Sequence, residues 1–197
     1  MTHFHIDADG RCAPARQLAS PHHDMRPEGM RVELIVLHNI SLPPGRFGGE
    51  EICDFFLGRL DPRGDAFLES IRHMRVSAHF LLRRDGAVVQ FVPTGLRAWH
   101  AGLSQWRGRE RCNDFSIGIE IEGTDDLPYD ERQYAALGPL LQALAAAHPA
   151  VNGVAGHEHV APVRKTDPGP AFDWVRVLKE SGLPRAWFDA VPAERLG

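Results

Sequence analysis

The clearest pattern in the chain is an alternation of apolar and polar residues over positions 116–122. Isoleucine occupies every second position of this segment, and the positions between hold Ser116, Gly118, Glu120 and Glu122. A repeat of two residues is typical of a β-strand, because successive side chains of a strand point to opposite faces. The segment therefore predicts a strand with one face in the core and one face available for function.

Two other regions predict strands. Residues 34–37 form a short apolar run, and the prolines and glycine of segment 41–45 cannot continue it, so we expect a buried strand that ends at His38. Residues 78–84 and 87–92 flank the dipeptide Asp85-Gly86. This dipeptide suits the positive φ angles of a tight type I′ turn, and the region therefore predicts a β-hairpin.

Three segments predict helices. In the longest, Asp130 and Gln133 resemble a capping pair, and apolar residues then recur every three or four positions until Pro149. Residues 50–60 and 172–181 predict two shorter amphipathic helices, the second stopped by Gly182. Since strands and helices do not alternate regularly, we predict an α+β fold with a single β-sheet and helices packed on it.

The length and composition are those of one globular domain spanning residues 1–197. The chain has 197 residues, of which 43% are hydrophobic, and we expect irregular structure over residues 1–30 and 183–197. No apolar run approaches the roughly 18–20 residues that cross a bilayer, and the first residues lack the basic and apolar regions of a secretory signal. We therefore expect a cytoplasmic protein that does not bind membranes.

Charge and cysteine content narrow the function further. The formal net charge is −4, so the chain has no overall positive field to attract nucleic acid or anionic lipid. Cys12, Cys53 and Cys112 are widely spaced and include no C-x-x-C pair, which argues against disulfides and against thiolate zinc sites. Eleven histidines are a first indication of metal or proton chemistry.

The densest group of metal-ligating residue types lies in segment 156–170, which contains His157, His159 and Asp167. One imidazole from this segment, the imidazole of His38 and the Asp167 carboxylate make three protein ligands. Three ligands leave a fourth position of a zinc ion open, as catalysis by zinc requires. The spacing does not decide between His157 and His159.

This segment also allows simpler interpretations. Pro168 favours extended backbone at Asp167, and in an extended segment Lys165 points to the same side as Asp167. The alternative is a surface loop with an ion pair from Asp167 to Lys165 or Arg164. For His38, the alternative is a core histidine that donates to a carbonyl group.

Glu120 is the candidate proton acceptor. It lies on the polar face of the predicted strand, beside Gly118, whose missing side chain leaves room for a substrate or another backbone. Partial burial at this position would raise the pKa of the carboxyl group toward neutrality, as a general base requires. Glu122 shares the face and is the rival candidate, and a solvated strand face is the alternative for both.

Two stretches have the composition of recognition surfaces. Residues 97–102 place Trp99 and His100 beside small residues, and residues 105–111 interleave Trp106 with arginines. Sugar faces and carboxylates suit such surfaces. An exposed charged loop is the interpretation we prefer for Arg107 and Arg109.

Seven strings follow one another along the chain: Ser20-Pro21-His22-His23-Asp24 with Arg26-Pro27, the segment 37–45, Arg75-Val76-Ser77-Ala78-His79, the segment 97–102, the segment 108–114, Ser116-Ile117-Gly118-Ile119-Glu120 and the segment 164–170. Together they resemble one family, the zinc-dependent N-acetylmuramoyl-L-alanine amidases, and within it the cytoplasmic 1,6-anhydro-N-acetylmuramoyl-peptide amidases of the AmpD type. The resemblance covers roughly residues 20–178.

The resemblance implies a role for each candidate. His38, His157 and Asp167 are implied to bind Zn²⁺. Glu120 is implied to be the proton acceptor, and Lys165 to stabilise the transition state. Positions that line the muramyl-peptide cleft correspond to Asn39, Arg75, Trp99, His100 and Arg111.

The resemblance also implies a mixed β-sheet flanked by helices and a specific reaction. The bond cleaved is the amide between anhydro-N-acetylmuramic acid and L-alanine, during peptidoglycan recycling. The expected partner is a small muropeptide, with no nucleic acid, membrane or obligate protein partner. The chain departs from relatives at residues 63–67 and 158–159, outside the five chemical positions. A binding module without hydrolysis and an enzyme acting on intact murein are the rival functions.

Overall fold

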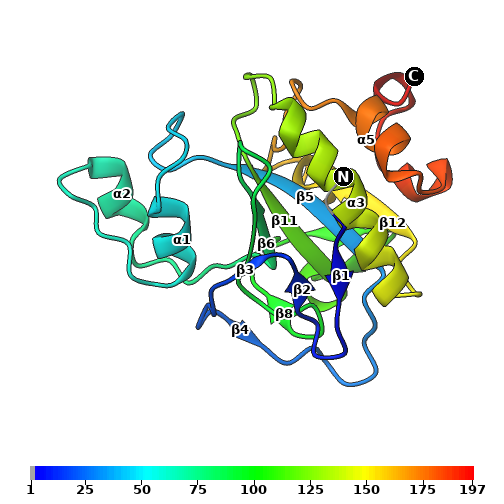
Figure 1. Ribbon diagram of the computed structural model, residues 1–197, viewed down its shortest axis with the longest axis horizontal. Helices are drawn as coiled ribbons and strands as arrows, with labels where there is room; N and C mark the ends of the chain where they lie inside the picture. The colour runs from blue at the N-terminus through cyan, green and yellow to red at the C-terminus, as the bar shows by residue number, and fades with distance from the viewer. Residues whose placement is uncertain (1–2) are drawn as a thin grey trace.

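The computed structural model describes residues 3–197, and its centre is a six-stranded mixed sheet with the order β12-β5-β11-β6-β7-β3 (Figure 1). Strands β12, β5, β11 and β6 run parallel, whereas β7 is antiparallel to β6 and parallel to β3. The strands are β3 (Arg16–Gln17), β5 (Leu34–Ile40), β6 (Phe80–Leu82), β7 (Val88–Gln90), β11 (Ser116–Glu122) and β12 (Gly153–Gly156). The predicted α+β fold with a mixed sheet is confirmed.

Three two-stranded ribbons lie outside this sheet. They are formed by β1 (His5–Ile6) with β2 (Cys12–Ala13), β4 (His23–Asp24) with β8 (Arg97–Ala98), and β9 (Gln105–Trp106) with β10 (Arg109–Glu110). The N-terminal region is therefore mostly irregular, as expected, with short strands inside it. Residues 1 and 2 of that predicted region lie outside the described residues.

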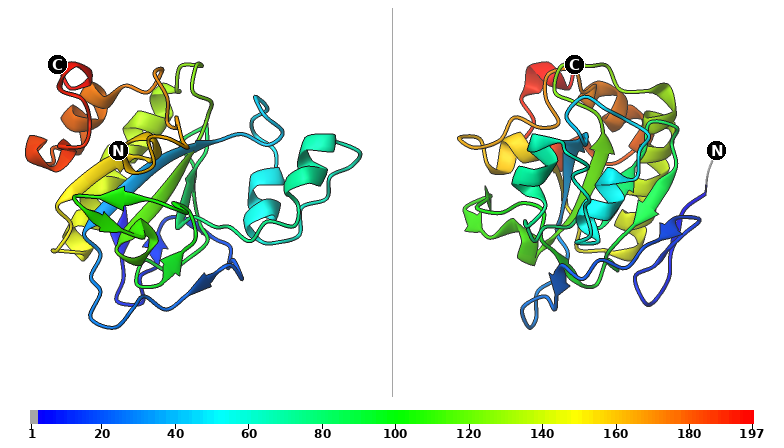
Figure 2. Two further views of the ribbon diagram at one scale, coloured as in Figure 1. Left: turned by 180° about the vertical axis from the view of Figure 1, so that it is seen from behind. Right: turned by 90° about the vertical axis from the view of Figure 1, so that its left-hand side faces the viewer.

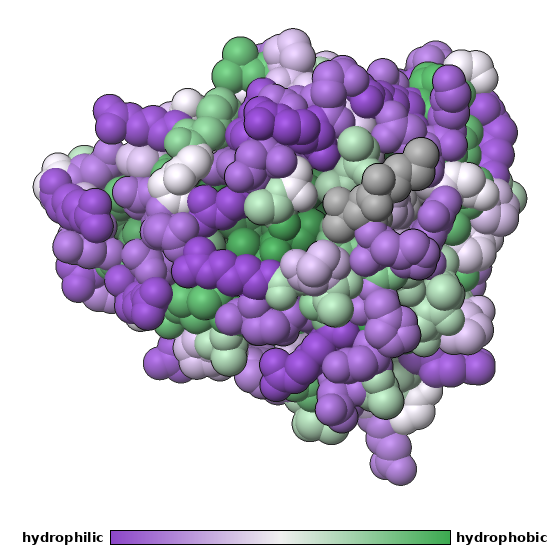
Figure 3. Space-filling model, viewed as in Figure 1, coloured by the Kyte–Doolittle hydropathy of each residue, from purple (hydrophilic) through white to green (hydrophobic). Residues whose placement is uncertain are grey.

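The helices are α1 (Glu51–Phe56), α2 (Ala66–Ile71), α3 (Glu131–Ala147), α4 (His157–Val160) and α5 (Trp174–Ser181). Helix α3 covers one face of the sheet with α5 beside it, while α1 and α2 form a lobe that projects from the sheet (Figures 1 and 2). On the face drawn in Figure 3 the surface is mainly hydrophilic, and apolar surface shows within a central hollow. Within residues 3–197, no helix has the length and apolar character needed to span a membrane.

Both faces of the central strands are buried. The isoleucines of β11 pack with Ile35, Leu37 and the apolar face of α3. On the opposite face, Leu34 and Val36 pack with a cluster from the 101–115 loops that includes Phe115. All seven residues of β11 are consequently buried, and a solvated face, the alternative for Glu120 and Glu122, is wrong.

Strand β5 is longer than the sequence predicts. It continues beyond His38, because Asn39 and Ile40 pair in register with Ile121 and Glu122 of β11. The predicted end at His38 is therefore wrong: His38 lies inside the strand. A neighbouring parallel strand of equal length sustains the pairing that the local sequence alone does not indicate.

The predicted hairpin exists, but its turn differs. The backbone N–H of Arg83 donates to the Ala87 carbonyl over 2.9 Å, which leaves a three-residue loop. Only Gly86 has a positive φ, +84°, whereas a type I′ turn requires positive φ at both central residues. Asp85 instead accepts a hydrogen bond from the Ala87 N–H through its side chain.

The helix predictions differ mainly at their ends. The capping box of Asp130 and Gln133 is present at the start of α3. Helix α1 ends at Phe56, before Gly58, which has φ +68°. Helix α5 begins at Trp174 and ends, as predicted, before Gly182, and two 3-10 turns follow it in the C-terminal segment. Helix α2 and the four-residue α4 were not predicted.

The contact between α3 and α5 depends on Gly138. A Cβ atom at this position would lie 2.7 Å from the backbone oxygen of Glu180. We expect Gly138→Ala to lower the free energy of unfolding by about 1–3 kcal/mol through overpacking, despite the higher helix propensity of alanine. Urea denaturation measures this loss.

Gly95 provides the control for this substitution. It has no positive φ, and a Cβ atom there would meet no atom of residues 3–197 within 4 Å. Gly95→Ala should leave the free energy of unfolding unchanged or slightly raised. Equal stability of the Gly138→Ala and Gly95→Ala variants would contradict the close α3–α5 contact.

Candidate metal centre and active site

Three adjacent parallel strands bring the candidate residues to one level of the sheet. His38 of β5 pairs directly with Glu120 of β11, so their side chains share a face. Gly156, the last residue of β12, pairs with Leu37, and His157 follows it as the first residue of α4. Two imidazoles and a carboxyl group therefore meet near the carboxyl ends of these strands.

Asp167 completes a compact group of metal-ligating atoms. The Nδ1 atoms of His38 and His157 lie 2.9 Å apart. The Asp167 Oδ2 atom lies 3.3 Å from the first and 3.1 Å from the second. Among the residues described, this is the one group of His, Cys, Asp or Glu side chains whose geometry could hold a metal ion.

The protonation of these three groups suits a cation. Burial lowers the pKa of His38 to about 4, which keeps its imidazole neutral at pH 7. Burial alone would raise the pKa of Asp167, but hydrogen bonds and charge from His157 and His38 outweigh it and lower the pKa. The Nε2 atom of His157 lies 3.1 Å from the Ala101 carbonyl oxygen, an acceptor, so Nε2 carries the proton and Nδ1 presents a lone pair.

A separate set of contacts holds the Asp167 loop. The side chain of Asp125 accepts hydrogen bonds from Asn39 Nδ2 over 2.8 Å and from Thr166 Oγ1 over 2.5 Å. Asn39 Nδ2 and the Tyr129 hydroxyl also donate to the Pro168 carbonyl. Asn39 therefore fastens the loop that carries Asp167, a contact that its predicted place in the substrate cleft does not explain.

The structure separates both pairs of rival candidates. His159 Nδ1 accepts from the Gly156 N–H over 2.9 Å, so this imidazole caps its own helix, and its ring packs against Trp174. Both carboxylate oxygens of Glu122 accept backbone N–H groups, from Gly48 and Arg84. His157 and Glu120 are the residues that remain at the centre.

Glu120 has the properties of a general base. Its side chain is 9% exposed, and its Oε2 atom has no hydrogen-bond partner among the described residues. Burial raises the pKa of Glu120 well above its ordinary value; the Asp167 charge adds to this effect, and the Lys165 charge opposes it. The Lys165 ammonium thus acts on Glu120 through its charge, and within residues 3–197 it forms no ion pair.

The family follows from comparison with known proteins. The model of the family N-acetylmuramoyl-L-alanine amidase matches residues 28–170. The curated 1,6-anhydro-N-acetylmuramyl-L-alanine amidase AmpD of Citrobacter freundii is 55% identical over 169 residues, which are 85% of this chain and 90% of that protein. The chain belongs to the N-acetylmuramoyl-L-alanine amidase family. The predicted family and enzyme class are confirmed.

Solved structures of amidases share this fold. A crystal structure of a selenomethionine derivative of AmpD has a TM-score of 0.86 at 52% identity, covering 91% of this chain and 99% of that chain. AmiD of E. coli, solved with its substrate anhydro-N-acetylmuramic acid-L-Ala-D-gamma-Glu-L-Lys, has a TM-score of 0.56 at 29% identity. That comparison covers 89% of this chain and 65% of the AmiD chain.

The other predicted cleft residues of the amidase lie at different depths. The Trp99 indole donates to Asp24 Oδ1 over 3.2 Å. Arg75 is exposed. It lies two residues before Ser77, and the backbone N–H of Ser77 donates to the Trp99 carbonyl. The side chain of Arg111 is 71% exposed and borders a hollow of about 420 Å³ lined by segments 102–105 and 160–164.

His100 occupies the space that Gly118 leaves on β11. A Cβ atom at Gly118 would lie 2.4 Å from the His100 ring. The expectation that this glycine makes room for a substrate or a backbone is therefore wrong, because a side chain of the amidase itself fills the space. The His100 ring also contacts His38 directly, Nδ1 to Nε2, over 2.9 Å.

The observed contacts bear on two simpler interpretations, an ion pair at Asp167 and an exposed charged loop at Arg107 and Arg109. Asp167 forms no ion pair with Lys165 or Arg164 among the described residues, and the Arg164 guanidinium instead donates to the Ala101 and Leu103 carbonyls. Arg107 and Arg109, preferred as an exposed charged loop, are 41% exposed and pair with Asp189 and Glu33.

Sequence reasoning missed residues that hold the site without touching its centre. Asp125 fastens the Asp167 loop, and Asn113 accepts the backbone N–H groups of His100 and Ala101. Asn113 lies within a string that resembles the family, but nothing in its spacing indicates its partners. Contacts between residues this far apart along the chain become visible only in the fold.

The Asp125 contacts predict how securely the Asp167 loop is held. In Asp125→Ala, loss of two hydrogen bonds of about 1 kcal/mol each should raise local opening at least tenfold. Trypsin cleavage after Arg164 and Lys165 under native conditions measures this opening. The exposed neighbour Asp126 is the control, and equal cleavage of Asp125→Ala and Asp126→Ala would show that Asp125 does not fasten the loop.

Proposed function

We propose that this amidase is a zinc-dependent hydrolase that cleaves the amide between 1,6-anhydro-N-acetylmuramic acid and L-alanine of muropeptides. The observation that carries the proposal is the group of His38, His157 and Asp167 with the buried Glu120 beside it. Identity of 55% to a curated 1,6-anhydro-N-acetylmuramyl-L-alanine amidase supports the substrate. The anhydromuramyl-peptide bound in the AmiD structure supports it as well.

The three ligand atoms fit zinc by type and by spacing. Two neutral imidazoles and one carboxylate form a ligand set that zinc accepts, and three protein ligands are characteristic of catalytic sites. In a tetrahedral site with ligands at 2.0–2.1 Å, neighbouring ligand atoms lie about 3.3–3.4 Å apart. The separations of 2.9–3.3 Å between these atoms are close to that value.

The proposed mechanism assigns one task to each side chain. When bound, zinc supplies a Lewis acid and lowers the pKa of water toward about 7. Glu120, whose raised pKa favours proton uptake, accepts a proton from the water that attacks the amide carbonyl, and then passes this proton to the leaving amine. The Lys165 ammonium stabilises the negative charge that develops on the carbonyl oxygen.

Trp99, Arg75 and Arg111 have side chains that suit the sugar and the stem peptide of a muropeptide. Trp99 presents an apolar ring to a sugar face, and the exposed guanidinium groups of Arg75 and Arg111 attract carboxylates of the stem peptide. We assign substrate binding to these three residues. Asn39 and His100, also predicted in the cleft, contribute through the loops and ligands they contact.

The cellular setting that we propose is cytoplasmic recycling of cell-wall fragments. The curated relatives are named as 1,6-anhydro-N-acetylmuramyl-L-alanine amidases, and this name supports an anhydromuramyl fragment as the substrate. Cys12, Cys53 and Cys112 are buried free thiols, a state that a reducing compartment maintains. A small soluble muropeptide is the proposed partner.

Two substitutions separate the role of Glu120 from that of the proposed metal ligands. Glu120→Gln should retain one zinc ion per chain and lose about 10²–10⁴-fold in turnover, because only the proton acceptor is removed. His38→Ala should lose zinc and turnover together. Metal analysis of purified variants and a peptide-release assay measure both quantities.

Glu131, exposed at the start of α3, provides the matched substitution. Glu131→Gln should leave zinc content and turnover unchanged. Wild-type turnover in Glu120→Gln would remove Glu120 from its assigned role.

The substrate is tested by presenting two forms of the same bond. We expect the zinc-loaded amidase to release peptide from anhydro-N-acetylmuramyl-tripeptide, and a chelator to abolish this release until zinc is restored. Mass spectrometry of the products identifies the bond that is cleaved. Binding without release would support a recognition module instead, and faster clearing of intact murein than fragment cleavage would assign a polymer substrate.

A further inference from the structure

One segment of the chain, residues 99–101, contacts both histidines of the proposed zinc site, through the His100 side chain and the Ala101 carbonyl. His100 Nδ1 lies 2.9 Å from His38 Nε2. The Ala101 carbonyl lies 3.1 Å from His157 Nε2. In each of the two histidines, the ring nitrogen that faces away from the metal position therefore contacts this segment. These contacts orient the His38 and His157 rings.

With zinc bound at His38 Nδ1, the contacts of His100 leave one consistent set of proton positions. For His38 to offer a lone pair at Nδ1, its proton must be on Nε2, from which it donates to His100 Nδ1. The His100 proton is then on Nε2, which lies 3.1 Å from the Ser116 hydroxyl oxygen. A hydroxyl group can accept this bond, so the chain of hydrogen bonds ends at Ser116.

Packing against neighbouring residues fixes the position of the His100 ring. It lies over Gly118, where any other residue would place a Cβ atom 2.4 Å from the ring, and it packs edge-on against His79 with ring centroids 5.8 Å apart. It also meets the His38 ring at an interplanar angle of 84°. This packing holds the imidazole at one distance from His38.

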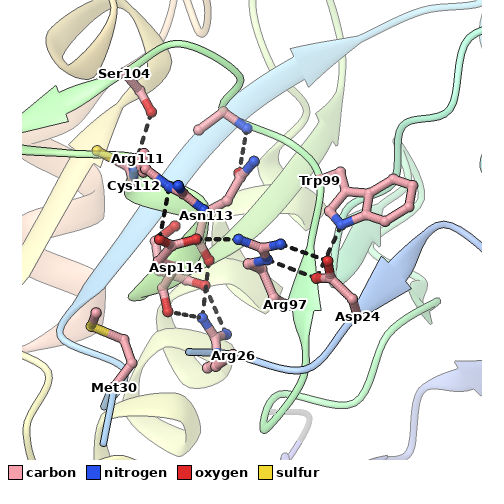
Figure 4. Close-up of polar contacts among 12 residues, drawn as sticks. Asp24, Arg26, Met30, Arg97, Trp99, Ser104, Arg111, Cys112, Asn113 and Asp114 are labelled. Atoms are coloured by element: carbon pink, nitrogen blue, oxygen red, sulfur yellow. Dashed lines mark hydrogen bonds and ion pairs between the residues drawn. The ribbon is translucent and has the colours of Figure 1, made fainter. Parts of the chain in front are cut away.

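The segment is anchored on the side away from the metal. Asn113 Oδ1 accepts the backbone N–H groups of His100 and Ala101 over 3.2 and 2.8 Å. Arg26 in turn donates to the Asn113 carbonyl over 3.1 Å. Figure 4 shows this arrangement, in which Arg97 also bridges Asp114 and Asp24. These anchors do not involve the ligands, so the segment is positioned before any metal binds.

We propose that His100 is a positioning residue that fixes His38 in the tautomer with a free Nδ1 lone pair. His100 Nδ1 accepts a hydrogen bond from the Nε2–H group of His38. The Ser116 hydroxyl accepts a hydrogen bond from the Nε2–H group of His100 and so fixes the tautomer of His100 in the same way. This inference rests on the proposed zinc site. It assigns His100 a task other than lining the substrate cleft, because the imidazole is turned toward the ligand.

Zinc affinity, measured by competition with a chelator of known affinity, tests the proposal without reference to turnover. His100→Leu should weaken zinc binding about 10–100-fold, the usual effect of removing a partner of a metal-bound histidine. His100→Asn should recover most of this loss, because its side-chain oxygen can accept the His38 proton. His148→Leu removes a partly buried histidine that contacts Thr94, and it should bind zinc as the wild type does.

Nitrogen-15 NMR of the zinc-loaded protein reads the tautomers directly. We expect the proton of His38 on Nε2, hydrogen-bonded to His100, and the proton of His100 also on Nε2. Ser116→Ala, a small change at a buried position, should weaken zinc binding in the same direction and remains usable if His100→Leu does not fold.

The outcomes separate this inference from the proposed function. A wild-type protein that binds no zinc would overturn both the zinc site and the role of His100. A wild type that binds zinc, with His100→Leu or Ser116→Ala binding it equally well, would overturn only the role of His100. A His38 proton on Nδ1 in the zinc-loaded protein would overturn it as well.

Discussion

The register of three parallel strands is the constraint on which the whole site depends. Strands β12, β5 and β11 are hydrogen-bonded neighbours, and their register is given by the pairing of His38 with Glu120 and of Leu37 with Gly156. A shift of one residue would turn His38 to the face that packs against α3 and remove it from His157. The apolar run of β5 and the apolar alternation of β11 therefore determine both the core and the position of the functional groups.

The site places two carboxyl groups in environments that shift their pKa values in opposite directions. Asp167 faces two imidazoles, and the pKa of its carboxyl group is lowered. Glu120 is buried, one of its oxygens has no partner among residues 3–197, and its pKa is raised. Such a separation assigns roles to carboxyl groups of similar intrinsic acidity: one suits a permanent anionic ligand and the other suits proton transfer. The Lys165 charge opposes the rise in the pKa of Glu120.

The sequence predicted what short-range patterns determine. The alternation at 116–122 defined β11, and the capping box located the start of α3. The candidate residues His38, Glu120 and Asp167 came from local composition, but the choice of His157 over His159 required the resemblance to a family. In the structure, the helix-capping contact of His159 with Gly156 gives this choice a physical reason.

Long-range contacts were beyond the sequence. The extension of β5 past His38 depends on pairing with a strand about eighty residues away, and the position of the His100 ring depends on Gly118 of β11. Asp125 was not a candidate, because its partners Asn39 and Thr166 come together only in the folded chain. Positioning residues such as these carry no local signature, whereas ligands and bases are recognisable by residue type.

Anomalous diffraction at the zinc absorption edge, from crystals of the zinc-loaded amidase, tests the central claim most directly. We predict one strong peak per chain, about 2.0–2.1 Å from Nδ1 of His38 and of His157 and about 2.0–2.2 Å from a carboxylate oxygen of Asp167. A peak coordinated by other residues, or zinc held through His159 in place of His157, would contradict the account.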